Sequence, residues 1–157
     1  MSKGTINPLA SSSDCAALYD QDFVLWLDHT VNLLRQGKVQ ELDLEHFADE
    51  IEAMGKREKR AIESNLKIIL VHLLKYQYQP QKRSRSWRST LLEHRQRIAR
   101  ALKDSPSLHA HLLANFQEVY AQARAKASAE TNLQADVFPV VSPFGLEQAL
   151  DQTYRPD

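Results

Sequence analysis

The sequence predicts an all-α protein: one helical bundle of about five main helices with a short helix near the C-terminus. Three observations lead to this prediction. Apolar residues recur every three or four positions over most of the chain, which is the spacing of a buried helix face. The 157 residues include only four glycines and six prolines, too few breaks for a protein of many strands. No stretch alternates between apolar and polar residues as a half-exposed strand does.

The N-terminal region predicts a flexible leader followed by a helix. Residues 1–18 contain a run of serines and the single cysteine, Cys15, and we expect a leader there, ahead of a helical domain over residues 19–154. Asp20 is the expected N-cap of the first helix, and Gly37 is its expected C-terminal cap. The apolar stripe of this helix consists of Tyr19, Phe23, Trp26, Leu27, Thr30, Val31 and Leu34.

A second and a third helix are predicted around Gly55, which is expected to end or kink the second one. The second helix begins near Asp43. Its expected buried face consists of Leu44, Phe47, Ala48, Ile51 and Met54. The third helix covers about residues 56–79 and stops before Pro80. Its segment Ile68–Leu74 is apolar almost all the way round, so we expect neighbouring helices to enclose it.

The second half of the chain predicts two long helices and a closing one. Helix four covers about residues 85–103, and its apolar face consists of Trp87, Leu91, Ile98 and Leu102. Ser105 and Pro106 are the expected N-cap and first residue of helix five. Residues 131–144 are expected to form an extended loop, and a short helix over about residues 145–152 closes the chain.

Charge is segregated along the chain, although 20 basic and 20 acidic residues give a formal net charge of zero. Residues 40–54 contain six acidic residues and no basic one, whereas residues 75–103 contain nine lysines or arginines against one acidic residue, Glu93. Two interpretations stay open. The acidic second helix packs beside the basic fourth helix, or each presents a separate surface to a partner.

A polar pocket is the main candidate for chemistry. His72 interrupts the most apolar segment, and a partly buried histidine beside a carboxylate can act as a base or bind a metal. Arg95 falls on the core face of helix four, where its guanidinium needs a carboxylate, from Glu50 or Glu52. An enzyme site would combine Glu50, His72, Lys75 and Arg95. Glu50 and His72 would then be metal ligands or proton carriers, and the two cationic side chains would bind an anion.

A structural interpretation of the same residues stays open beside the catalytic one. His72 is then a core histidine with one hydrogen bond, and Arg95 is half of a structural ion pair. No Glu-x-x-His pair, nucleophile elbow or phosphate-binding glycine loop occurs, so the sequence predicts no cofactor.

Binding to nucleic acid through the basic segment 82–100 is a further hypothesis, because this segment combines lysine and arginine side chains with the aromatic ring of Trp87. The basic side chains point in different directions around the predicted helix and form no single stripe. No apolar run approaches the ~20 residues that cross a bilayer, and the start of the chain lacks a signal-peptide pattern. We therefore expect a cytoplasmic protein without a membrane partner.

Short motifs spread over the chain form one recognisable combination. They are Tyr19-x-x-Asp22-Phe23-x-x-Trp26, Leu34-Arg35-x-Gly37, Asp43-Leu44-Glu45, Glu50-Ile51-Glu52 before Gly55, His72–Gln77 with Pro80, Ser86-Trp87, Ser105–Leu108 and Phe138-Pro139. Together they resemble a bacterial family, domain of unknown function 29, from about Tyr19 to Tyr154. The resemblance implies a small helical domain without an assigned activity. It gives no role to Glu50, His72, Lys75 or Trp87, which match the family's pattern.

Two hypotheses of function remain. The preferred one is a helical binding or interaction module whose acidic and basic surfaces recognise a protein partner or a second copy in a homodimer. The other is a small enzyme, or a metal- or anion-binding protein, with the polar pocket around Glu50, His72, Lys75 and Arg95.

Overall fold

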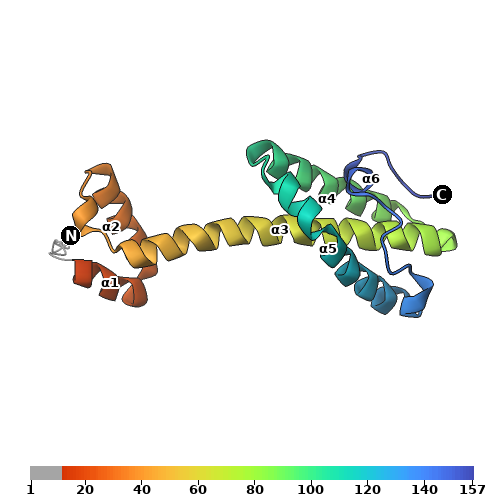
Figure 1. Ribbon diagram of the computed structural model, residues 1–157, viewed down its shortest axis with the longest axis horizontal. Helices are drawn as coiled ribbons and strands as arrows, with labels where there is room; N and C mark the ends of the chain where they lie inside the picture. Colours follow the sequence, from red (N-terminus) through yellow and green to blue (C-terminus); the bar gives the residue numbers. More distant parts are fainter. Residues whose placement is uncertain (1–11) are drawn as a thin grey trace, which may run out of the picture. The chain divides into compact units, whose positions relative to one another are not determined.

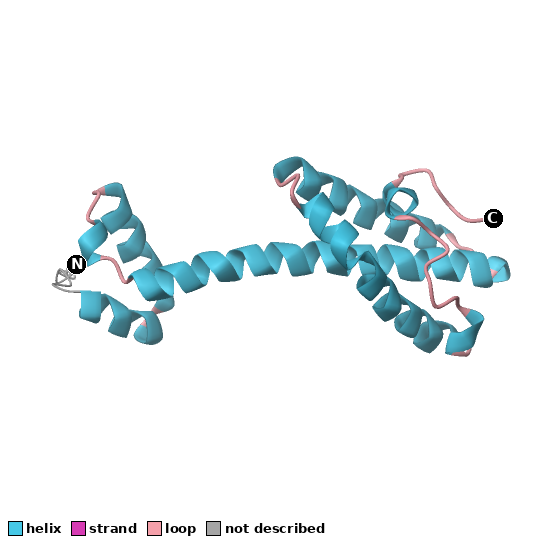
Figure 2. Ribbon diagram, in the orientation of Figure 1, coloured by secondary structure: helices cyan, strands magenta, loops and turns pink. Residues whose placement is uncertain are grey.

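The computed structural model describes residues 12–157 (Figure 1). Helices, loops and short 3-10 turns make up this part of the chain, which contains no strand (Figure 2). Its α-helices are α1 (Ser12–Gln21), α2 (Phe23–Arg35), α3 (Leu44–Tyr78), α4 (Arg85–Asp104), α5 (Leu108–Thr131) and α6 (Leu146–Leu150). The all-α prediction is confirmed.

The chain divides into two compact units. The N-terminal unit extends to Lys56 and includes α1, α2 and the first part of α3. The C-terminal unit begins at Arg57 and includes the rest of α3 together with α4, α5 and α6. Each unit has a cluster of buried apolar residues of its own.

The leader predicted over residues 1–18 is wrong for residues 12–18, which form most of α1. The remaining part of that predicted leader, residues 1–11, lies outside the described residues. Helix α1 buries one residue, Cys15, which packs with Leu33 and Leu42. A helix that buries a single side chain has no apolar stripe, so periodicity could not reveal it.

Both ends of α2 have clear capping interactions. Asp22, rather than the predicted Asp20, is the N-cap, and its carboxylate accepts a hydrogen bond from the backbone N–H of Leu25 at 3.0 Å. At the other end Gly37 has a φ of +71°, a left-handed conformation that suits glycine. Its N–H and that of Lys38 donate to carbonyls of the last turn, which confirms Gly37 as the cap.

The helix boundary predicted at Gly55 does not exist, because α3 runs through this residue without a break. A glycine in a helix interior costs only about 1 kcal/mol relative to alanine. Ending the helix would instead leave backbone groups of both segments without partners. Helix α3 ends at Tyr78, before Pro80, as predicted.

The C-terminal unit encloses α3 as the sequence predicts. Residues Leu66, Ile69, Leu70, Leu73 and Leu74 are fully buried. The residues that surround them come from α4, α5, the loop after α5 and α6, and the largest are Leu91, Ile98, Leu112, Tyr120, Phe138 and Phe144. This packing fixes the positions of α4 and α5 on α3.

The connection between α4 and α5 differs from the prediction. Helix α5 begins at Leu108 with Ser107 as its N-cap, so Ser105 and Pro106 do not open it. The backbone N–H of Ser105 instead donates to the carbonyl of Ala101 and ends α4, and the Ser105 carbonyl accepts from Leu108 in a turn. The predicted loop 131–144 contains one short 3-10 turn, Ala135–Val137.

An aromatic and polar cluster joins the three helices of the N-terminal unit. Trp26 is fully buried, and its Nε1 donates to the buried carboxylate of Asp43 at 3.3 Å. The same carboxylate lies 2.6 Å from Nδ1 of His46. The ring of Tyr19 stacks on His46 with 4.0 Å between centroids, and its hydroxyl donates to Glu50 at 2.7 Å. A buried carboxylate needs such partners, because an unpaired charge is costly to bury.

The hydrogen bond with Asp43 raises the pKa of His46 above its ordinary value of 6.5. A raised histidine pKa stabilises the fold below pH 6.5, and this contribution is lost as pH rises through the folded-state pKa. We expect an NMR titration to place His46 above 6.5 and Asp43→Asn to lower its pKa. Asp28→Asn, which removes an exposed carboxylate of the same unit, should leave it unchanged. A wild-type pKa at or below 6.5 would contradict this pairing.

Replacing Gly55 with alanine should stabilise the protein by about 0.5–1 kcal/mol, because alanine is the better residue in a helix interior. Apart from the adjacent residues and the backbone of α3 itself, no described atom lies within 4 Å of the position that the added Cβ would occupy. The free energy of unfolding from urea denaturation measures the change. Gly37→Ala is the control and should destabilise the protein, because Gly37 has a positive φ. Destabilisation by Gly55→Ala would show that α3 is not a regular helix at this residue.

Candidate functional sites

Each of the four residues of the predicted polar pocket forms hydrogen bonds with groups outside that set of four. Glu50 belongs to the N-terminal unit, where it accepts the hydrogen bond from Tyr19. His72, Lys75 and Arg95 belong to the C-terminal unit. Among the described residues, no hydrogen bond or ion pair joins any two of the four.

Arg95 is buried as predicted, with 2% of its surface exposed, but its partners are different. Its Nε donates to the carbonyl of Ala149 at 2.8 Å, and Nη2 lies 3.5 Å from the carbonyl of Gln148. Both carbonyls belong to the last turn of α6, where a helix leaves such groups without partners. The expected ion pair with Glu50 or Glu52 is therefore wrong. Burial lowers the pKa of Arg95, and the guanidinium attaches α6 to α4.

His72 has the contacts of a core histidine. Its Nδ1 lies 2.9 Å from the carbonyl of Ile68, one turn earlier in α3, and its ring meets the edge of Trp87. Burial lowers the pKa of His72 below 6.5, so the imidazole is neutral at pH 7. Among residues 12–157, no group of three or more His, Cys, Asp or Glu side chains is arranged to bind a metal ion.

Lys75 connects three helices of the C-terminal unit. Its Nζ lies 3.1 Å from a carboxylate oxygen of Glu130 on α5. The same ammonium lies over the ring of Trp87 on α4, 4.8 Å from the ring centroid. Trp87 is partly buried against the apolar core, and its ring also contacts Tyr76. These contacts give Lys75 and Trp87 a role in packing.

Two apolar stripes of the N-terminal unit lie exposed, which the sequence did not predict. On α2 the exposed fractions range from 38% to 42% for Phe23, Leu27, Val31 and Leu34. On α3 they range from 53% to 56% for Leu44, Ile51 and Met54. The predicted burial of the α3 stripe is wrong, and of its five residues only Phe47 is partly buried. The described residues cover part of the α2 stripe, for example where Tyr19 packs on Phe23, and they leave the rest of both stripes open to solvent.

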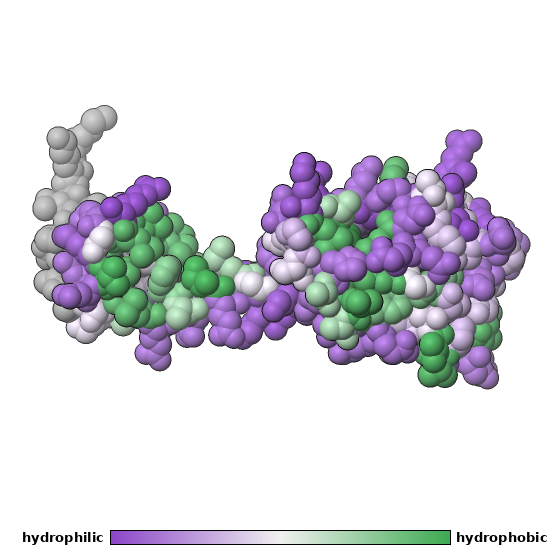
Figure 3. Space-filling model, turned by 45° about the horizontal axis from the view of Figure 1, so that its top comes forward, coloured by the Kyte–Doolittle hydropathy of each residue, from purple (hydrophilic) through white to green (hydrophobic). Residues whose placement is uncertain are grey.

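The exposed apolar surface is concentrated in this unit. Ten of the fifteen large apolar side chains that are exposed within residues 12–157 belong to it. Figure 3 shows hydrophobic side chains gathered on the surface of the N-terminal unit. Residues 12–56 also contain ten acidic residues and three lysines or arginines. The unit therefore combines an apolar surface with an excess of negative charge, a combination typical of protein-binding sites.

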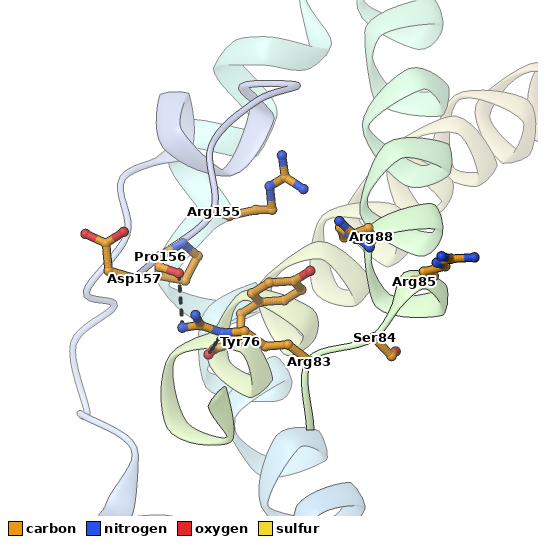
Figure 4. A pocket seen from close by; sticks show the side chains of 8 residues that line it. All are labelled: Tyr76, Arg83, Ser84, Arg85, Arg88, Arg155, Pro156 and Asp157. Atoms are coloured by element: carbon orange, nitrogen blue, oxygen red, sulfur yellow. Dashed lines mark hydrogen bonds between the residues drawn. The ribbon is translucent and has the colours of Figure 1, made fainter. Parts of the chain in front are cut away.

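Part of the basic segment lines a cavity of the C-terminal unit. Arg83, Arg85 and Arg88 meet Arg155, which is far away in the sequence, around a space of about 530 Å³. The other lining residues are Tyr76, Ser84, Pro156 and Asp157. Figure 4 shows how these side chains lie. Sequence reasoning singled out the first three arginines as part of a basic segment and missed Arg155, because no local pattern connects it with α4.

No helix within residues 12–157 is long and apolar enough to cross a membrane. In comparisons with other proteins, no curated protein and no solved structure matches the chain. Residues 18–155 match the model of one family, described as domain of unknown function DUF29. The match includes α2 to α6 in full, the last four residues of α1, and the motifs on which the resemblance rests. The chain therefore belongs to the DUF29 family of domains of unknown function.

Proposed function

We propose that the protein is an interaction module and that its N-terminal unit binds an apolar, basic helix of a partner protein. The observation that supports this proposal is the pair of apolar stripes on α2 and α3 that the described residues leave partly exposed. The unit acts in the cytoplasm, where the single buried thiol of Cys15 stays reduced.

The spacing of the two stripes favours a helical ligand. Phe23, Leu27 and Val31 follow one another at intervals of four residues, so they form one continuous row along α2. Leu44, Ile51 and Met54 form a second row on α3, at intervals of seven and three residues. A partner helix is recognised by apolar rows of this kind when its own apolar face docks against them.

Charge favours a basic partner over a second copy. The ten acidic residues of residues 12–56 include Asp28 on α2 and Glu45 and Asp49 on α3, all exposed. A second N-terminal unit that docked through the same surface would place carboxylates beside carboxylates, and like charges at an interface oppose binding. Lysines or arginines around the apolar face of a partner would instead be attracted.

Two synthetic helical peptides with the same leucine face test this proposal, one with lysines and one with glutamates on the polar face. We expect isothermal titration calorimetry with the full chain to detect binding of the lysine peptide and none of the glutamate peptide. Ile51→Gln and Met54→Gln should each weaken binding about five-fold, since each removes an apolar contact at the interface. Thermal stability should change little, because both side chains are exposed.

Leu113→Gln is the matched control, because Leu113 is an exposed leucine of the C-terminal unit. It should bind the lysine peptide as tightly as the wild type does. Equal binding of both peptides, or no binding of either, would contradict the proposal. So would a dimer in light scattering that Ile51→Gln dissociates, because a second copy would then be the occupant of this surface.

A further inference from the structure

We propose that the arginine-lined cavity of the C-terminal unit binds the phosphate group of a small phosphorylated molecule with an apolar part. This site is separate from the apolar surface of the N-terminal unit, and its residues belong to the C-terminal unit alone.

The cavity concentrates positive charge between α4 and the C-terminal segment. Four of its eight lining residues are arginines, and Asp157 is the one acidic side chain among them. Arg83 is held in place, because its Nε donates to the carbonyl of Tyr76 at 3.0 Å and its Nη2 to that of Pro156 at 3.4 Å. The guanidinium groups of Arg88 and Arg155 have no hydrogen bond or ion pair with any described residue. Their donors are available to a ligand.

The hydroxyl of Tyr76 is a second, independent indication of a ligand. Tyr76 is only 5% exposed, and it lines the cavity. Its ring packs against Trp87 and lies under the guanidinium of Arg83, and the hydrogen bonds of the described residues involve its backbone carbonyl but not its hydroxyl. The hydroxyl is open to the cavity, where it can form a hydrogen bond with a ligand. In Figure 4 this hydroxyl and the guanidinium groups of Arg88 and Arg155 point toward one common space, whereas Arg85 points away from it.

This set of donors suits a phosphate group. A guanidinium group can donate two parallel hydrogen bonds to phosphate oxygens. The Tyr76 hydroxyl can donate a further hydrogen bond to the same phosphate. The cavity also lies at the N-terminus of the 20-residue helix α4, which Ser84 caps. The positive end of the helix dipole and the unpaired N–H groups of the first turn favour an anion there. These groups attract a dianion more strongly than a monoanion.

The shape of the site favours a small molecule larger than phosphate itself. Arg88 and Arg155 also line a second cavity of about 200 Å³. Leu91, Leu92 and Gln152 are its other lining residues, so the two leucines give it an apolar side. A space of about 530 Å³ lies within the range of small-molecule sites. A phosphate between the arginines thus leaves room for an apolar group beside the two leucines.

Phenyl phosphate and phenyl sulfate are the probes that test this site. They share the ring, but the phosphate is a dianion at pH 8 and the sulfate is a monoanion. We expect phenyl phosphate to bind the full chain with a dissociation constant of roughly 1 mM or below. Phenyl sulfate and inorganic phosphate should each bind several-fold more weakly. In ¹H–¹⁵N NMR spectra the largest shifts should fall on the backbone amides of residues 84–88.

Substitutions distinguish this site from general attraction to positive charge. Arg88→Gln and Arg155→Gln should each weaken binding of phenyl phosphate about ten-fold or more, because each removes charged hydrogen bonds. Tyr76→Phe removes one hydroxyl without a partner, so it should leave the thermal unfolding midpoint unchanged and weaken binding about three-fold or more. Arg100→Gln is the matched control, since Arg100 is an exposed arginine of α4 outside the cavity. It should change the dissociation constant of phenyl phosphate by less than two-fold.

Three results would overturn the proposal. The first is no binding of phenyl phosphate at 10 mM, a concentration about ten times the expected constant. The second is equal binding of phenyl phosphate and phenyl sulfate, because the site would then select the ring. The third is equal weakening by Arg88→Gln and Arg100→Gln together with tight binding of a thymidine oligonucleotide, which would identify a nucleic-acid surface along α4 instead.

Discussion

The continuity of α3 is the constraint on which the rest of the structure depends. This helix of 35 residues contributes to both units, and its apolar residues meet different surroundings in each. In the C-terminal unit α4 and α5 enclose it, and Leu66–Leu74 form the centre of the core. In the described part of the N-terminal unit, Tyr19 of α1 contacts it, and its apolar residues from Leu44 to Met54 lie largely exposed. The binding surface that we propose results from this difference in coverage.

The small size of the N-terminal unit explains why many apolar side chains of its described residues stay exposed. Its described part has 45 residues, and so small a unit buries a limited share of its surface. Its apolar core is correspondingly small, with Cys15, Leu33 and Leu42 packed together and Trp26 fully buried. Specific polar contacts supplement this core, because the carboxylate of Asp43 holds both Trp26 and His46. A partner that covers α2 and α3 would bury the apolar side chains that stay exposed among residues 12–56.

The sequence was enough to predict the helical class, the C-terminal cap at Gly37, the end of α3 before Pro80 and the enclosed segment Ile68–Leu74. Each of these follows from local propensity or from apolar spacing. Spacing reveals which face of a helix is apolar, but it does not reveal what lies against that face. For this reason the burial of Leu44, Ile51 and Met54 was predicted wrongly. The partners of Arg95 and the place of Arg155 beside Tyr76 depend on contacts between distant segments, which one sequence does not encode in any local pattern.

The exposure of the α3 stripe in solution is the central claim of this account. Relaxation of methyl signals by a soluble paramagnetic gadolinium chelate tests it directly, because relaxation increases as a methyl group becomes accessible to solvent. The account predicts strong relaxation for the methyl groups of Leu44, Ile51 and Met54 and weak relaxation for those of Leu66, Leu70 and Leu73. Equal protection of both sets, at a protein concentration where light scattering shows a monomer, would contradict it.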